Sequence, residues 1–125
     1  MKTLLLSCLF CFAPIALKAQ PLERRCGWLS NPTPANWFLA DRSGDWTISV
    51  QGGFEAQGMD KINLQNERDY VRTNGSYGYA CACLDVVTKR SGQSWRITKI
   101  HGFKQLLLKQ CLEDPALRRA PVCAY

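Results

Sequence analysis

Cysteines are the residues of this sequence whose type and number most clearly suggest chemistry. The chain has 125 residues and seven cysteines. Cysteine side chains form disulfides, hold metal ions or act as nucleophiles, depending on their surroundings. Cys8 and Cys11 fall in an N-terminal apolar segment that we expect to be removed from the mature protein. The folded domain is then left with five cysteines, namely Cys26, Cys81, Cys83, Cys111 and Cys123.

The spacing of Cys81 and Cys83 restricts their pairing. They lie two residues apart in a predicted strand, so their side chains leave the same face of that strand. Parallel Cβ directions do not meet disulfide geometry, so each cysteine needs a partner elsewhere. Several pairings remain open. Our preferred one bonds Cys26 and Cys111 to the Cys81/Cys83 pair and leaves Cys123 as the free thiol.

Metal binding and Cys–His catalysis are the competing uses of these cysteines. His101 is the only histidine, and the five cysteines after residue 19 include no Cys-x-x-Cys pair of the kind that holds zinc. We therefore expect no metal site. A small hydrolase that uses His101 with a free cysteine or a carboxylate remains the alternative function. The carboxylates considered for it are Asp41, Asp45, Glu55 and Asp60.

No catalytic residue can be assigned from a motif. The sequence lacks the nucleophile elbow, the His-Glu-x-x-His zinc motif, the phosphate-binding loop and the dinucleotide glycine pattern. Large aromatic residues are a more informative signal. Exposed tryptophan and tyrosine next to Asn, Ser and Gly suit recognition of a protein or a carbohydrate. The candidate binding residues are Trp28, Trp37, Tyr77 and Tyr79, with Trp28 and Trp37 expected to be the most exposed.

The first nineteen residues are typical of a secretory signal peptide. Lys2 supplies the positive start, residues 4–17 are almost entirely apolar, and Ala19 ends the segment with a small residue. The apolar run is shorter than the roughly 20 residues needed to span a bilayer, and no later run is longer. An N-terminal buried helix or membrane anchor is the alternative. We expect a periplasmic or secreted protein whose mature chain does not span a membrane.

Charge excludes one class of partner. The whole chain has 16 basic and 10 acidic side chains, a formal charge of +6. Without residues 1–19 the charge is about +4, because Lys2 and Lys18 are lost. The basic pairs at 24–25 and 118–119 do not form the continuous stripe that nucleic acid requires. We expect no nucleic-acid partner and no cofactor.

Short segments in which apolar and polar residues alternate, with turns between them, must position these residues. Trp46, Ile48 and Val50 share one face of a strand that follows the turn at 41–44. Residues 77–87 and 94–100 form a second predicted hairpin, and Asn74-Gly75 a third turn. Residues 59–64 are a weak strand candidate.

The C-terminal part is less clear. Residues 103–112 suit a helix or a buried strand, and Asp114-Pro115 is typical of a helix start. The predicted fold for residues 20–125 is one domain. It is mainly β, a small disulfide-stapled antiparallel β-sandwich or barrel with a short C-terminal helical turn.

Several motifs together resemble a known family. The sequence is similar to a family of small exported proteobacterial proteins catalogued as a domain of unknown function, over roughly residues 26–117. The resemblance is carried by Cys26-Gly27-Trp28, Gly78-Tyr79-Ala80-Cys81-Ala82-Cys83 and Lys109-Gln110-Cys111. It implies a Gram-negative periplasmic or secreted setting and no assigned activity. Cys123 lies outside the pattern.

These observations lead to one functional expectation. We expect a non-enzymatic module that binds an envelope protein or a glycan, with inhibition of an attacking enzyme as one form of it. The sequence does not specify the ligand or the oligomeric state.

Overall fold

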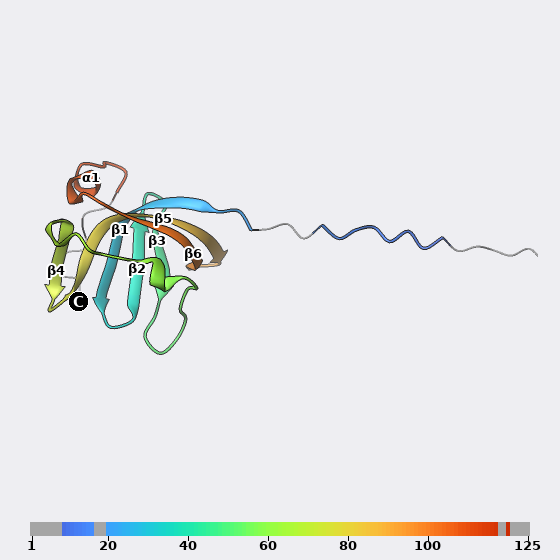
Figure 1. Ribbon diagram of the computed structural model, residues 1–125, viewed down its shortest axis with the longest axis horizontal. Coiled ribbons are helices and arrows are strands. Elements are labelled where there is room, and N and C mark those ends of the chain that lie inside the picture. Colours follow the sequence, from blue (N-terminus) through green and yellow to red (C-terminus); the bar gives the residue numbers. More distant parts are fainter. Residues whose placement is uncertain (1–8, 17–19, 118–119, 121–125) are drawn as a thin grey trace, which may run out of the picture.

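The computed structural model describes residues 9–16, 20–117 and 120. Residues 9–16 have no regular secondary structure, and they run away from the folded domain (Figure 1). Their apolar side chains are exposed; Phe12, for example, is 93% accessible to solvent. The predicted signal peptide, residues 1–19, lies partly outside the described residues. The described part of it is neither a helix nor buried in the domain.

Six strands dominate the fold, as predicted. They are β1 (Glu23–Thr33), β2 (Asn36–Asp41), β3 (Asp45–Ser49), β4 (Tyr70–Asn74), β5 (Tyr77–Ser91) and β6 (Ser94–Leu106). Two single-turn 3-10 helices, η1 (Met59–Lys61) and η2 (Glu67–Asp69), connect β3 to β4, and α1 (Leu108–Leu112) follows β6. The mainly β fold with a short C-terminal helix is therefore confirmed.

The strands close into a small barrel. Neighbours follow the order β1-β2-β3-β6-β5, and β5 pairs back onto β1 (Figure 1). All pairings are antiparallel except β3–β6, which touch in parallel where Thr47 lies opposite Arg96. Five strands therefore form a closed ring in the order β1, β2, β3, β6 and β5. β4 adds a short extra strand beside the start of β5.

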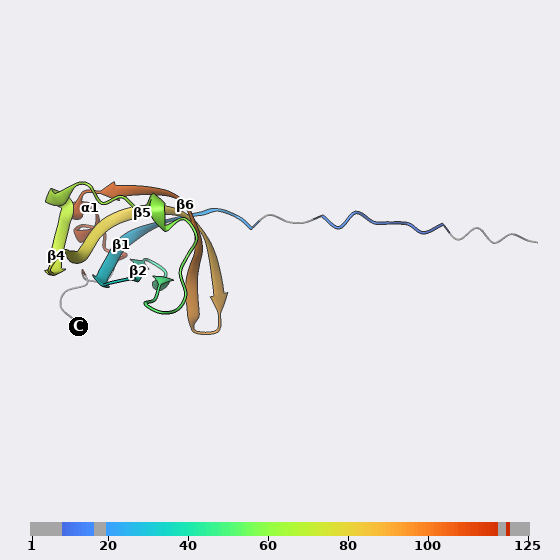
Figure 2. The same cartoon turned by 60° about the horizontal axis from the view of Figure 1, so that its bottom comes forward.

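Local turn chemistry explains the hairpins. The carboxylate of Asp41 accepts hydrogen bonds from the backbone N–H groups of Ser43 (2.8 Å) and Gly44 (3.1 Å), which sets the turn between β2 and β3. Gly75 has a φ of 58° in the turn between β4 and β5, as the Asn-Gly pair predicts. In Figure 2 the far ends of β5 and β6 extend from the barrel as a two-stranded arm.

The interior is filled by alternate residues of each strand. Of the three residues predicted to share one face, Trp46 and Ile48 are fully buried, but Val50 lies just past the end of β3 and is 42% exposed. Trp46 and Ile48 pack against apolar residues of the other four barrel strands, including Leu29, Leu39, Leu84, Val86, Ile97 and Ile100. One continuous core therefore holds the barrel together. Because this core lies inside the barrel, the outer face of β1 is covered by other parts of the chain.

Two disulfides fasten the chain to β5. Cys26 is bonded to Cys83 and Cys81 to Cys111. Each bond joins one cysteine of the central pair to one near an end of the domain, which is our preferred arrangement. Cys123, the predicted free thiol, lies outside the described residues. Among the described cysteines only Cys11 is free, in the exposed segment before the domain.

Some local predictions are wrong. Residues 59–64 are not a strand: η1 occupies 59–61, and Ile62 and Leu64 pack against the core without pairing. Asp114-Pro115 does not start a helix, because Asp114 instead caps a turn by accepting a hydrogen bond from the N–H of Ala116 (2.9 Å). The ambiguous segment 103–112 contains both alternatives, the end of β6 and then α1.

Candidate functional site

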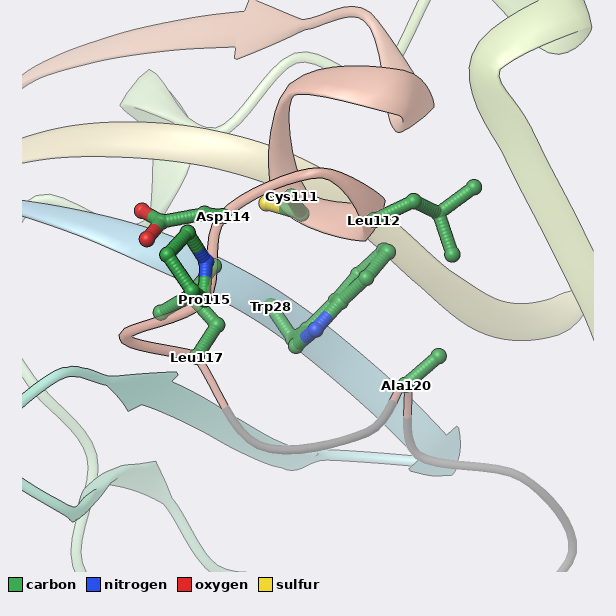
Figure 3. A pocket seen from close by; sticks show the side chains of 7 residues that line it. All are labelled: Trp28, Cys111, Leu112, Asp114, Pro115, Leu117 and Ala120. Atoms are coloured by element: carbon green, nitrogen blue, oxygen red, sulfur yellow. The ribbon is translucent and has the colours of Figure 1, made fainter.

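A hollow beside the outer face of β1 is the candidate site. Its apolar end encloses about 410 Å³. Figure 3 shows Trp28 rising from β1 beneath Leu112 of α1, with the turn after α1 on its other side. The lining residues are Trp28, Cys111, Leu112, Asp114, Pro115, Leu117 and Ala120.

The Cys81–Cys111 bond explains why α1 lies here. It ties the helix to the outer face of β5, beside Trp28 on the neighbouring strand. Asp69 adds a second anchor, because its carboxylate accepts a hydrogen bond from the N–H of Leu108 at 2.9 Å. Trp28 also packs edge-to-face on Tyr79, with 5.4 Å between ring centroids. The walls of the hollow are therefore fixed by a covalent bond and a buried aromatic pair.

A second hollow of about 280 Å³ adjoins the first and is charged. The two share Asp114 and Leu117, so they form one groove with an apolar end and a charged end. We call this the β1 groove. The charged end is lined by Arg24, Arg25, Cys26, Asp41, Arg42, Asp114 and Leu117.

Arg25 and Asp41 form the buried part of the charged end. A guanidinium N–H of Arg25 donates to the Asp41 carboxylate at 2.8 Å, and the side chains are 14% and 3% exposed. Glu23 accepts a further hydrogen bond from Arg25. Burial alone would lower the pKa of Arg25, but these two carboxylates outweigh it and raise the pKa. The guanidinium also lies over the Trp46 ring, 4.1 Å from its centroid, so Arg25 is committed to the fold.

The rim of the charged end is more available. Arg24 pairs with Asp85 across β1 and β5 at 2.9 Å, but its side chain is 65% exposed. The hydrogen bond from Arg24 lowers the pKa of Asp85. Arg42 is exposed and forms no ion pair with any residue of the described chain. Arg42 is thus the rim cation with the least internal role.

The four predicted binding residues do not form one surface. Trp28 is only 2% exposed and Tyr79 is 7% exposed. The expectation that Trp28 is exposed is wrong, because β1 is paired on both edges and α1 and the following turn cover its outer face. Trp37 is half-buried against the core, and Tyr77 is half-buried at the start of β5. Only Trp28 lines the β1 groove.

Sequence reasoning missed the rest of the groove. Leu112 and Leu117 follow Cys111, the last disulfide cysteine, by one and six residues. Arg42 lies in the segment 41–44, which was predicted to be a turn but not part of a site. The signal in the sequence that could have located these groove residues is the preferred cysteine pairing. Bonding Cys111 to a central strand necessarily brings the apolar residues around it onto that strand.

The structure describes only some of the residues of the hydrolase alternative, since Cys123, its predicted free thiol, lies outside the described residues. His101 is exposed on β6, and its side chain forms no ion pair with the described residues. Cys26, Cys81, Cys83 and Cys111 are all in disulfides. Of the candidate carboxylates, Asp41 is paired with an arginine, while Asp45, Glu55 and Asp60 are exposed.

Two features are absent from the part of the chain that the structure describes. No three or more His, Cys, Asp or Glu side chains within residues 9–16, 20–117 and 120 are grouped so that they could hold a metal ion. Over the same ranges, no helix has the length and apolar character needed to cross a membrane.

Comparison with known proteins identifies the family. The model of the family described as "Protein of unknown function (DUF4087)" matches residues 20–118. No curated protein and no solved structure matches the chain. The family match spans every strand, both disulfides and nearly all of the β1 groove. The chain therefore belongs to the DUF4087 family of proteins of unknown function.

Proposed function

We propose that this protein is an exported, non-enzymatic module that binds another protein of the cell envelope through the β1 groove. The observation that carries the proposal is the groove itself. A rigid apolar hollow and a cationic rim lie side by side on an otherwise well-packed barrel. Binding sites of proteins commonly combine an apolar pocket with a few charged groups that fix orientation.

Export is supported by two features. Both disulfides fit an oxidising compartment such as the periplasm or the extracellular space. Apolar residues 9–16 lie outside the domain, as a removable signal peptide would.

The chemistry of the groove favours a protein segment over a glycan. Sugars are usually held on an exposed aromatic face, but Trp28, the aromatic residue that lines the groove, is 2% exposed. Leu112, by contrast, is 66% exposed at the mouth of the apolar end. Arg24 and Arg42 stand at the other end. The fitting ligand is a segment with one bulky apolar side chain followed by an acidic one.

The test compares partner capture by matched variants. Leu112→Glu places a charge at the mouth of the apolar end, and Arg42→Glu reverses the rim charge. Val50→Glu and Arg68→Glu are controls of the same chemistry outside the groove, since Val50 is 42% exposed and Arg68 is exposed in η2. The full chain, expressed with its own leader, is used to recover partners from envelope extract. Both groove variants are expected to lose a partner that the wild type and both controls retain.

Cross-linking then identifies what touches the groove. A photo-reactive residue at position 112 should label a segment of the partner that contains apolar and acidic residues. Equal recovery by all variants, or cross-links to no protein, would refute the proposal. Retention on purified envelope polysaccharide, lost with Leu112→Glu, would replace the protein partner with a glycan.

A further inference from the structure

The β5–β6 arm carries a set of polar side chains that the β1 groove does not use. Lys89 lies opposite Arg96 across the two strands, and Ser91 lies opposite Ser94. Residues two apart on a strand share a face, so all four side chains project from one side of the arm. They line a hollow of about 270 Å³. Two cations and two hydroxyl groups are therefore gathered at one place.

Nothing in the described chain neutralises this pair of cations. Like charges directly opposite each other on a sheet are destabilising. Neither Lys89 nor Arg96 forms an ion pair with any carboxylate of the described residues.

The opposite side of the same arm has a structural explanation. Arg90 and Trp95 lie opposite each other there. The Arg90 guanidinium lies 4.2 Å from the centroid of the Trp95 ring and 5.0 Å from that of Trp46. That arginine therefore completes the aromatic stack at the end of the barrel. Neither Lys89 nor Arg96 belongs to that stack.

Arg96 is held in place without using its hydrogen-bond donors. Its guanidinium lies over the Phe54 ring, 4.8 Å from the centroid. A contact of the guanidinium carbon with a ring face does not consume the N–H groups, which stay available as hydrogen-bond donors. A fixed arginine beside a lysine and two hydroxyls is an arrangement that suits a tetrahedral oxyanion.

We propose that Lys89, Ser91, Ser94 and Arg96 form a binding site for a phosphate or sulfate group. Arg96 donates two hydrogen bonds to the anion, Lys89 supplies the second charge, and the two hydroxyls donate to the remaining oxygens. The group belongs either to the headgroup of an anionic lipid or to a small soluble phosphate or sulfate. The site is independent of the β1 groove, because the two share no residue.

The test is an NMR titration of the purified full chain with inorganic phosphate, and then with sulfate. Sodium chloride at equal ionic strength is the reference, since non-specific charge screening affects every exposed cation. Saturable shifts are expected in the amides of residues 89–96 with phosphate or sulfate and not with chloride. Lys89→Ala and Arg96→Gln are each expected to weaken binding about tenfold, the loss that corresponds to one charge-assisted hydrogen bond.

Lys109→Ala is the matched control. It removes one exposed cation from α1, outside this site, and should leave the affinity unchanged. Circular dichroism confirms that each variant is folded, and Lys89→Ala keeps the test open if Arg96→Gln is unstable. Absence of saturable shifts, equal shifts with chloride, or equal weakening by Lys109→Ala would overturn the proposal.

Vesicles distinguish the two sources of the anion. Co-sedimentation with phosphatidylglycerol vesicles but not with phosphatidylcholine vesicles, lost in Lys89→Ala, assigns the site to a lipid headgroup. Phosphate binding without any co-sedimentation assigns it to a soluble anion.

Discussion

Removal of each disulfide in turn should give a stability order that loop length alone does not predict. The perturbations are the double variants Cys26→Ala/Cys83→Ala and Cys81→Ala/Cys111→Ala. The bonded residues are 57 and 30 positions apart in sequence. From these loops the chain-entropy relation gives about 4.2 kcal/mol for the first bond and about 3.6 kcal/mol for the second. Loop closure by itself therefore makes Cys26–Cys83 the more stabilising bond.

Burial reverses that order. Cys81 and Cys111 are 1% and 4% exposed and pack with Trp28, whereas Cys26 is exposed. Replacing two buried sulfur atoms by hydrogen adds about 1–2 kcal/mol of lost packing. The Cys81→Ala/Cys111→Ala variant should then lose about 5 kcal/mol of unfolding free energy, against about 4 kcal/mol for the other variant.

Urea unfolding, followed by tryptophan fluorescence without reductant, measures the two losses. In the uncleaved full chain Cys11→Ser serves as the control, because that thiol is exposed and outside the domain, and it should leave the midpoint unchanged. A variant that is already unfolded without urea counts as the less stable of the two. If Cys26→Ala/Cys83→Ala proves the less stable, the argument from burial is refuted.

Three further outcomes are expected. Gly78→Ala should unfold the β4–β5 region, because the added Cβ would lie 1.8 Å from the carbonyl oxygen of Val71. Amide hydrogen exchange in this region should become faster, and unchanged exchange rates would contradict the close contact. Asp41→Asn should cost about 2 kcal/mol in urea unfolding, since it leaves a largely buried guanidinium with one carboxylate partner; a neutral result would show that pairing unimportant. The hydrogen bond from Arg24 lowers the pKa of Asp85 in the folded protein. The stability that this bond contributes is therefore present at pH values above the pKa of Asp85 in the unfolded chain, and it is lost as the pH falls through the pKa of Asp85 in the folded protein. Asp85→Asn should therefore lower Tm slightly near neutral pH and not in strong acid, and equal shifts at both would contradict this.

The parts of the fold that depend on neighbouring residues could be predicted from the sequence. Turns at 41–44 and 74–75 are set by side chains and glycines within the turn itself. Alternation of apolar residues predicted the inward positions of Trp46 and Ile48 in β3 but not that of Val50, which is exposed after the strand ends. Cys81 and Cys83 had to point the same way because a strand repeats every two residues. Each of these inferences needs only a few consecutive positions.

The features of the fold and of the site that could not be predicted depend on contacts between segments that are distant in sequence. Trp28 is buried because a helix 80 residues later is bonded over it, and nothing near Trp28 in sequence reports this. Residues 59–64 resembled a strand because Ile62 and Leu64 alternate toward the core, yet the bridge to β6 is isolated at Gln57 and the chain turns into η1 at Met59. The parallel approach of β3 and β6, which closes the barrel, likewise joins segments about 50 residues apart.

The two disulfides also have a consequence for survival among proteases. Their covalent loops overlap, because Cys81 of the second bond precedes Cys83 of the first. Any single backbone cut between residues 26 and 111 therefore leaves the two fragments joined by at least one S–S bond. A nick in the exposed connection between β3 and β4, or at the tip of the β5–β6 arm, would not separate the pieces. Fragments that stay joined avoid the full loss of entropy on reassociation. The protein can thus be cut once and remain a single molecule.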